Sequence, residues 1–184
     1  MNLKDLAPRI HEMNRSKGFW DNERTLPEVG LLICSEISEA VEALRKGDQF
    51  SSKDESIKEF DFELADVLIR CMDAVIGFDL DVELCDFETK SVSIDDDYEL
   101  DFNEVMQVLW DISLDIADLI SRMHRLLQVD AEIEACSVFV KREFGLICQG
   151  LFELALYRGV NLLTVIQRKL EINEIRPRLH GKVF

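Results

Sequence analysis

The segment IKEFDFELADVLIRCMDAVIG, residues 57–77, decides the fold of this chain. Most of its positions after residue 59 are apolar, and from Glu63 onward the polar positions recur every three or four residues. At about 100° per residue, four polar positions fall within an arc of roughly 80° on a helix: Glu63, Asp66, Arg70 and Asp73. A helix that is apolar around the rest of its surface is largely buried. We therefore expect a buried helix over residues 57–76 with one narrow polar stripe.

The same spacing of apolar residues predicts helices along the rest of the chain. We expect them at residues 3–16, 26–46, 80–89, 102–127, 130–157 and 162–175, with a polar loop at 48–55 and an acidic linker at 91–101. Thr25 and Asn161 stand where N-caps are needed, because their side-chain oxygens can accept a backbone N–H at the start of a helix. Only 3 Pro and 8 Gly interrupt the 184 residues, which favours long helices with short connections. The fold class we expect is all-α, a helical bundle.

The balance of charge restricts the partners of the chain. It carries 21 Lys and Arg against 37 Asp and Glu, a formal net charge of −16. Such a field repels a phosphate backbone, so we expect no nucleic acid bound through a basic face. A small polyanion is repelled as well, unless a cation lies between it and the carboxylates. A divalent metal ion is the simplest such cation.

The cysteines and the apolar runs indicate the compartment. No two of the 5 Cys form a CxxC pair, and most lie inside apolar helical runs, which is typical of buried free thiols rather than of disulfides or a zinc site. Residues 1–8 lack the apolar core of a signal sequence, and no apolar run is long enough to span a bilayer. We expect a cytoplasmic protein without a membrane partner.

Two acidic pairs are the strongest candidates for chemistry. Glu36 and Glu39 are one helical turn apart, and Glu36 is flanked by apolar positions, where an ordinary amphipathic helix carries no charge. If this helix faces the helix of Glu63 and Asp66, the four carboxylates form an oxygen-rich site suited to Mg²⁺ or Mn²⁺. The alternative is a solvated face without a metal, in which Asp66 and Arg70 form an i,i+4 ion pair.

The order of these motifs resembles that of a known family. Glu36-x-x-Glu39 followed by Glu63-x-x-Asp66 resembles the ExxE…ExxD signature of the MazG-like all-α nucleoside triphosphate pyrophosphohydrolases. Near the far end, KLEINEIRP at residues 169–177 resembles the KxxxNxxRP tail of that family, and NRSKGFW at residues 14–20 resembles a stretch before its first metal helix. The resemblance covers about residues 5–90 and 145–184. It implies a helical bundle of the MazG-like type.

The middle of the chain departs from this pattern. In short family members the KxxxN helix directly follows the ExxD helix, whereas here some eighty further residues precede the tail. A faint repeat, GFDL at 77–80 and GVNL at 159–162, favours a duplication, although helical chains also repeat such patterns by chance. We expect a first half at residues 1–90 with the acidic motif, a linker at 91–101 and a degenerate second half at 102–184 with the tail. The two four-helix-like halves then pack as one domain with one complete site; the alternative is that the separation has cost activity.

The resemblance also implies an activity, the hydrolysis of a nucleoside triphosphate or deoxynucleotide to the monophosphate and pyrophosphate. Metal-bound water attacks the α-phosphorus, and one or more Mg²⁺ ions, or Mn²⁺ in their place, are held by four carboxylates: Glu36, Glu39, Glu63 and Asp66. Either Glu36 or Glu39 orients or deprotonates the water. Asp73 is an additional ligand or a group that hydrogen-bonds a ligand. The rival is a degenerate scaffold or regulatory protein of the same fold without turnover.

The resemblance assigns the nucleotide substrate to residues of the tail and of the N-terminal stretch, namely Lys169, Asn173, Arg176 and Arg178 with Trp20, Asn14 and Lys17. The basic side chains suit the phosphates of a substrate in an otherwise negative protein, although a helix C-terminus also favours cations. Trp20 stacks on a base or packs in the core. The preferred nucleotide is left open, selectivity for dUTP or phosphoribosyl-ATP being an alternative, and we expect a homodimer.

Overall fold

The computed structural model describes residues 3–80, 101–128 and 133–178 of the chain, and these residues are mostly helical. The helices are α1 (Leu3–Ser16), α2 (Leu26–Arg45), α3 (Glu59–Gly77), α4 (Phe102–Gln128), α5 (Ile133–Tyr157) and α6 (Leu162–Ile175). The prediction of a mostly helical chain is confirmed, and the bounds of α1 and α6 agree with it. The expected helix at 80–89 and linker at 91–101 lie almost wholly outside the described residues.

The expected polar loop at 48–55 is wrong in part, because this region contains a small antiparallel hairpin. Strand β1 (Phe50–Ser51) pairs with β2 (Asp54–Lys58), Phe50 opposite Lys58 and Ser51 opposite Asp54, with an irregularity in register between the two pairs. The strands are short and mostly polar, so they lack the alternation of apolar and polar residues that marks a strand in a sequence. The hairpin leads directly into α3.

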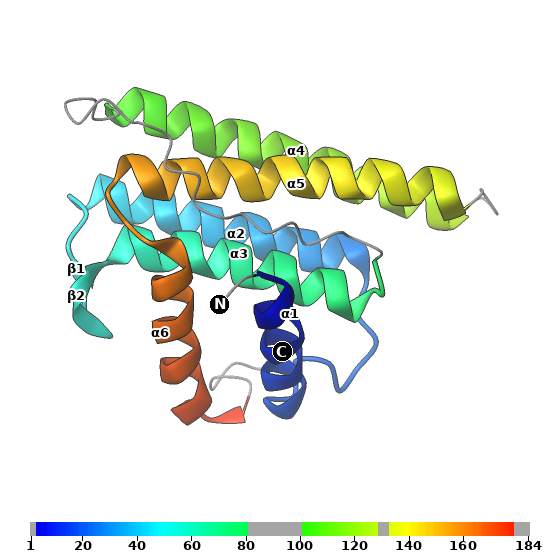
Figure 1. Ribbon diagram of the computed structural model, residues 1–184, viewed down its shortest axis with the longest axis horizontal. Helices are drawn as coiled ribbons and strands as arrows, with labels where there is room; N and C mark the ends of the chain where they lie inside the picture. Colours follow the sequence, from blue (N-terminus) through cyan, green and yellow to red (C-terminus); the bar gives the residue numbers. More distant parts are fainter. Residues whose placement is uncertain (1–2, 81–100, 129–132, 179–184) are drawn as a thin grey trace.

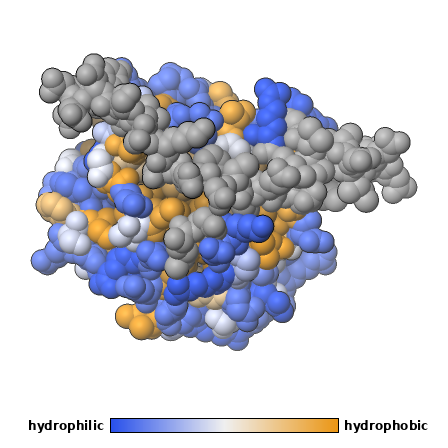
Figure 2. Space-filling view, viewed as in Figure 1, coloured by the Kyte–Doolittle hydropathy of each residue, from blue (hydrophilic) through white to orange (hydrophobic). Residues whose placement is uncertain are grey.

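The helices form two layers with two further helices across them (Figure 1). Helices α2 and α3 lie side by side and run in opposite directions, and α4 and α5 form a second, longer pair that packs on them. Helices α1 and α6 cross beneath α3 at a steep angle to it (Figure 1). On the face shown in Figure 2, hydrophilic residues dominate the region where α1 and α6 lie in Figure 1.

Helix α3 lies at the centre of the molecule, as its sequence predicts. It packs against α1, α2, α5 and α6, and most of its apolar side chains are buried. Burial on all sides also encloses three of its acidic residues, Asp61, Glu63 and Asp73. A buried carboxylate is costly unless it has a partner or is neutralised, so the partners of these three groups show what each of them does.

The two expected N-caps hold the helices that flank the site. Thr25 Oγ1 accepts a hydrogen bond from Glu28 N at the start of α2, and Asn161 Oδ1 accepts one from Thr164 N at the start of α6. These bonds satisfy backbone donors that have no partner within the helix. In the part of the chain that the structure describes, none of the helices combines the length and apolar character needed to cross a membrane.

Candidate metal centre

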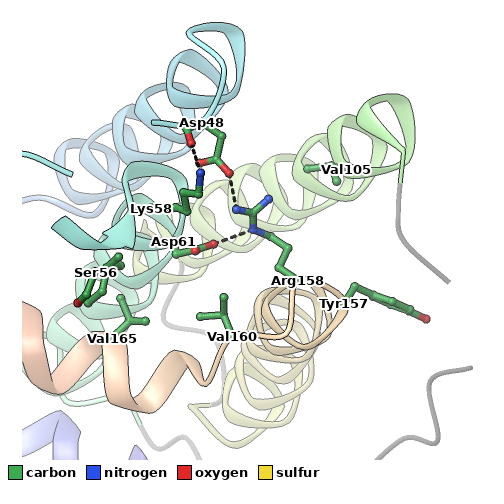
Figure 3. Close-up of a pocket in the computed structure, with 10 residues that line it drawn as sticks. Asp48, Ser56, Lys58, Asp61, Val105, Tyr157, Arg158, Val160 and Val165 are labelled. Atoms are coloured by element: carbon green, nitrogen blue, oxygen red, sulfur yellow. Dashed lines mark hydrogen bonds and ion pairs between the residues drawn. The ribbon is translucent and has the colours of Figure 1, made fainter. Parts of the chain in front are cut away.

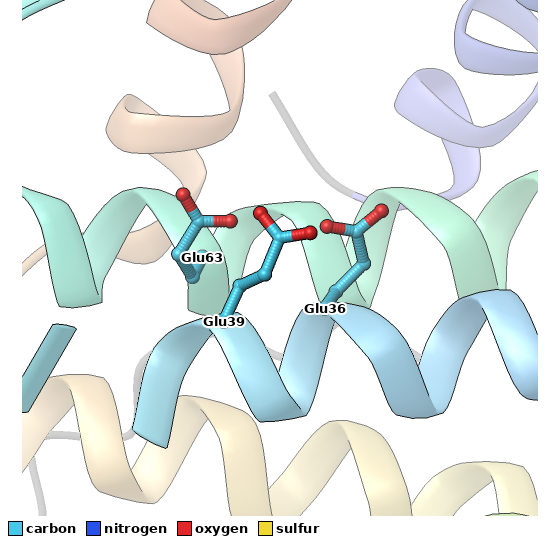
Figure 4. A group of neighbouring side chains, drawn as sticks. All are labelled: Glu36, Glu39 and Glu63. Carbon is cyan, nitrogen blue, oxygen red and sulfur yellow. The ribbon is translucent and has the colours of Figure 1, made fainter. Parts of the chain in front are cut away.

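Three carboxylates from two adjacent helices converge on one point. Glu36 and Glu39 of α2 and Glu63 of α3 each offer an oxygen, and these oxygens lie within 4.8 Å of one another (Figure 4). The spacing of three residues places Glu36 and Glu39 one turn apart on the same face of α2, and the packing of α2 on α3 brings Glu63 opposite them. The sequence predicts that four carboxylates come together, and the geometry brings these three together without Asp66.

Glu63 is the most unusual member of this trio. Its side chain is 3% exposed, and its Oε2 is one of the few buried polar atoms among the described residues that have no hydrogen-bond partner. Burial raises the pKa of Glu63 to about 7, against the opposing charges of Lys169 and Lys53. Its other oxygen, Oε1, lies 3.5 Å from Lys53 Nζ. An oxygen-only donor set with a buried unpaired oxygen fits a hard divalent cation such as Mg²⁺ or Mn²⁺.

Glu36 is held by a basic residue of α3. Arg70 Nε donates a hydrogen bond of 2.9 Å to Glu36 Oε1, and both side chains are largely buried. Burial raises the pKa of Glu36, and so does the charge of Asp66, whereas Arg70 lowers it. Helical spacing offers an alternative, an ion pair between Asp66 and Arg70 on α3. Among the described residues, Arg70 pairs with Glu36 of α2 instead.

Asp66 has a basic partner from the far end of the chain. Lys169 Nζ of α6 lies 2.5 Å from Asp66 Oδ2, and Lys169 is 1% exposed, with its ammonium 4.9 Å from the centre of the Phe62 ring. The ammonium makes this ion pair but no well-aligned hydrogen bond with the other described residues. Asp66 therefore lies beside the trio of Glu36, Glu39 and Glu63 without belonging to it.

A cavity of about 110 Å³ joins the acidic residues to a basic wall. Its lining comes from α1, α2, α3 and α6, from the residues just after α1 and α6, and from the hairpin. The lining residues are Asn14, Phe19, Glu36, Glu39, Lys53, Asp66, Ile69, Arg70, Lys169, Asn173 and Arg176. The acidic motif and the tail thus meet in space, although a long stretch of sequence separates them. The arrangement places carboxylates for a cation next to donors for an anion, which is what a metal–phosphate complex needs.

Asp73 lies outside the trio and has other partners. His11 Nδ1 lies 2.7 Å from its Oδ1, Asn14 Nδ2 donates to its Oδ2 at 2.8 Å, and Trp20 Nε1 donates to both oxygens at 3.0 and 3.1 Å. These contacts tie α1 and the segment after it to α3. Because three side chains already engage the carboxylate of Asp73, we do not propose it as a metal ligand.

The other residues expected at the substrate divide into two groups. Asn14, Asn173 and Arg176 line the cavity, whereas Trp20 packs edge-on against His11 and Phe78, with ring centroids 5.1 and 5.5 Å apart. Trp20 therefore packs against its neighbours and does not face the cavity.

Lys17 and Arg178 belong to the chain's own framework. Lys17 Nζ donates to the carbonyl oxygens of Glu174 and Arg176, and Arg178 forms an exposed ion pair with Asp21. The two side chains thus join the N-terminal region to the end of α6. Neither of them lines the cavity.

Two basic residues of the cavity were not expected there. Lys53 lies in the turn of the hairpin, which the sequence pattern does not reveal, and its Nζ lies 3.1 Å from Glu59 Oε1 as well as near Glu63. Arg70 belongs to the predicted polar stripe, where the spacing suggests Asp66 as its partner. The buried acidic residues themselves indicate that cationic side chains must lie nearby, because a buried carboxylate needs a partner of opposite charge.

A separate, larger cavity of about 450 Å³, lined by Arg158 and Asp61 among others, lies at the other end of the hairpin (Figure 3). Its charged groups pair with one another: Arg158 Nη2 lies 2.6 Å from Asp48 Oδ2, Arg158 Nε lies 2.7 Å from Asp61 Oδ1, and Lys58 Nζ donates to the Asp48 carbonyl. These contacts clamp the end of α5 to α3 and to the loop after α2. The pairing makes this cavity a weaker candidate for binding a charged ligand.

Comparisons of this chain with protein-family models, with curated proteins and with solved structures gave no match.

Proposed function

We propose that this protein hydrolyses a nucleoside triphosphate to the monophosphate and pyrophosphate, with a divalent cation held by Glu36, Glu39 and Glu63. The observation that carries the proposal is the convergence of these three carboxylates, one with a buried unpaired oxygen, next to a cavity with basic side chains. The MazG-like arrangement of the motifs supports the same reaction.

The three carboxylates suit Mg²⁺, and Mn²⁺ in its place, because hard cations prefer oxygen ligands. When bound, such a cation screens the triphosphate from the carboxylates and polarises the reacting phosphoryl oxygens. Asp66, on the next turn of α3, adds negative charge beside the trio. The net charge of −16 makes this screening necessary for any polyanionic substrate.

The basic wall of the cavity suits the phosphates. Lys53, Lys169 and Arg176 present cationic groups there, and Asn173 adds an amide that can donate a hydrogen bond. Charge-assisted hydrogen bonds from such groups are stronger than neutral ones and favour the more negative transition state. These residues orient the triphosphate so that its α-phosphorus faces the acidic residues.

Glu39 is the best candidate for the general base. It is exposed, whereas Glu36 already accepts a hydrogen bond from Arg70 and Glu63 is buried. In the reaction, the oxygen of water bonds to the α-phosphorus, its proton passes to the Glu39 carboxylate, and the bond from the α-phosphorus to the bridging oxygen breaks to release pyrophosphate. Of the two residues that the sequence offered for this role, the geometry favours Glu39.

Pyrophosphate release from each natural NTP and dNTP in the presence of Mg²⁺ tests the proposal. We expect turnover by the wild type and a loss of about a hundredfold or more in Glu39→Gln. Glu42→Gln is the control, since Glu42 lies one turn further along α2 and its ion-pair partners among the described residues are the exposed Arg45 and Lys46. No turnover of any nucleotide by the wild type contradicts the proposal, and sharp selectivity identifies the substrate.

One observation favours a second candidate, a scaffold or binding protein of this fold without turnover. Three acidic residues of the site already have basic neighbours in the chain: Glu36 has Arg70, Glu63 has Lys53 and Asp66 has Lys169. Such pairs can stabilise the fold without a metal. This candidate predicts no turnover in the same nucleotide panel. We propose separately that the protein forms a homodimer, and a measurement of its mass in solution tests this.

A further inference from the structure

Lys53 lies between a surface hairpin and the buried carboxylate of Glu63. It lies in the turn between β1 and β2, and its backbone N donates to Ser51 Oγ. Its side chain is 34% exposed, and its ammonium lies 3.1 Å from Glu59 Oε1 and 3.5 Å from Glu63 Oε1. The residue thus reaches from a surface hairpin to the buried carboxylate of the trio.

Two cavities meet at Lys53. One is the acidic cavity of about 110 Å³ described above, and the other has a volume of about 530 Å³. The lining of the second cavity is Lys53, Arg168, Glu171, Ile172, Ile175 and Arg176, so the two cavities share Lys53 and Arg176. The second cavity carries three cationic side chains and one acidic one, and of the cationic groups Arg168 already pairs with Asp54 and Glu171. It lies next to the acidic residues, because it shares Lys53 and Arg176 with the acidic cavity.

The ammonium of Lys53 and a divalent cation compete for Glu63. Both are positive, and Glu63 Oε1 already lies next to Nζ, so a cation bound to the trio repels the ammonium at close range. A lysine ammonium is a compact charge on a flexible stem of four carbons, so it can move away from Glu63, although a large movement also breaks its hydrogen bond to Glu59. We infer that Lys53 is an exchangeable counter-ion, which neutralises Glu63 until a divalent cation displaces it into the second cavity, where it binds the pyrophosphate end of the substrate with Arg168 and Arg176.

The other lysine of the site lacks this freedom. Lys169 is 1% exposed and lies 2.5 Å from Asp66, so a movement of its ammonium would leave Asp66 without this close partner. Lys53 is partly exposed, its contact with Glu63 is longer, and its hairpin has only two short strands. The exchange therefore involves Lys53 and leaves the buried pair of Lys169 and Asp66 in place.

The inference rests on the proposed function, because it takes the trio as the cation site. It goes further in assigning the second cavity to the pyrophosphate group and in coupling the two binding events. A cation that releases Lys53 increases the affinity for the anion, and by thermodynamic reciprocity the anion increases the affinity for the cation. Lys53 is thus a binding and positioning residue rather than a base or nucleophile.

Two binding measurements on Lys53→Met and Lys53→Arg test this inference. The affinity for Mn²⁺ alone is measured from the electron paramagnetic resonance signal of the free ion, and the affinity for inorganic pyrophosphate by calorimetry at saturating Mg²⁺. We expect Lys53→Met to bind Mn²⁺ about tenfold more tightly than the wild type, because a competing charge is gone. The same variant should bind pyrophosphate about tenfold more weakly, because a charge-assisted donor is lost.

Lys53→Arg keeps the charge and should leave both affinities near those of the wild type. Lys46→Met is the control for removing a lysine, since Lys46 pairs with Glu42 at 3.4 Å on the exposed side of α2, and we expect it to change neither affinity. Unchanged or weaker Mn²⁺ binding by Lys53→Met, or unchanged pyrophosphate binding, overturns the inference while leaving the cation site intact. A wild type and variants that all fail to bind Mn²⁺ overturn the proposed function itself.

Discussion

Lys169 Nζ lies 2.5 Å from Asp66 Oδ2, and this contact joins the tail of the chain to its acidic motif. Lys169 is almost fully buried, so bulk water solvates its charge poorly, and Asp66 is its one ion-pair partner among the described residues. The pair fixes α6 against α3 and positions a cationic side chain on the wall of the cavity. A single site is thus built from both ends of the chain.

We predict that Lys169→Met lowers the free energy of unfolding by about 2–4 kcal/mol, because the charge of Asp66 loses its partner in a largely buried setting. The double variant Lys169→Met/Asp66→Asn should recover much of this loss, since no unpaired charge is left. Urea denaturation of the two variants measures both effects. Arg168→Met is the control, since the ion pairs of Arg168 with Asp54 and Glu171 lie nearer the surface and should contribute much less to stability than the buried pair. Additive losses in the double variant contradict the pairing.

Asp73 gives a prediction about structure rather than about metal binding. Asp73→Ala leaves the donors of His11, Asn14 and Trp20 without their common acceptor, which should cost about 2–4 kcal/mol of stability. Asp111→Ala is the control, because Asp111 is exposed and its side chain accepts one hydrogen bond, from Gln107, in the described part of the chain. Thermal unfolding measures both variants. A normal stability of Asp73→Ala together with a loss of Mn²⁺ affinity contradicts this assignment and returns Asp73 to the metal ligands.

Much of the helical framework follows from the sequence, because strong local signals determine it. Thr25 and Asn161 cap the helices they precede, and the apolar surface of α3 predicts its burial. The hairpin could not be predicted in the same way, because a two-residue strand such as Phe50–Ser51 has no periodicity and depends on the neighbouring helices for its stability.

Gly77, at the end of α3, leaves no room for a side chain beside Trp20. A Cβ added there would overlap Cη2 and Cζ2 of Trp20, so the indole ring must move. Because Trp20 is also held by Asp73 and packs against Phe78, we expect Gly77→Ala to cost about 1–3 kcal/mol. Gly145→Ala in α5 is the control, since nothing lies within 4 Å of its added Cβ, and it should be neutral or slightly stabilising. Equal stabilities of the two variants in urea denaturation contradict the predicted contact.

The titration of Glu63 predicts how stability depends on pH in the absence of divalent cations. The pKa of Glu63 is about 7 in the folded chain because of burial, and near 4.5 when the chain is unfolded. Between these values the folded state keeps a proton that the unfolded state has lost, so the free energy of unfolding falls as pH rises from 4.5 to 7. Glu63→Gln should remove this part of the fall, which amounts to at most about 3 kcal/mol.

Urea denaturation at a series of pH values with a chelator present measures the difference between the wild type and Glu63→Gln. With Mn²⁺ in place of the chelator, the stabilisation of the wild type should grow as pH rises toward neutrality, because the cation binds the ionised carboxylate. Parallel curves for the wild type and Glu63→Gln under both conditions contradict the role of Glu63.

The sequence predicts a meeting of four carboxylates, of which the structure groups three and leaves Asp66 beside them, and it does not predict how their charges are balanced. Helical spacing puts Glu36, Glu39 and Glu63 on facing surfaces, and they do converge. The same spacing suggested Arg70 as a partner of Asp66, whereas Arg70 reaches across to Glu36 and Asp66 receives Lys169 instead. The choice between two acidic neighbours depends on the relative position of packed helices, which a one-dimensional pattern does not contain.

The most direct test of the central claim is a crystal of the wild-type protein soaked with Mn²⁺ and measured near the manganese absorption edge. We predict an anomalous difference peak among Glu36, Glu39 and Glu63, with carboxylate oxygens from these residues at about 2.0–2.6 Å from it, and the ammonium of Lys53 farther from Glu63 than the present 3.5 Å. A fully soaked crystal without a peak at these carboxylates, or with its peak elsewhere on the protein, contradicts the claim that they form a metal centre.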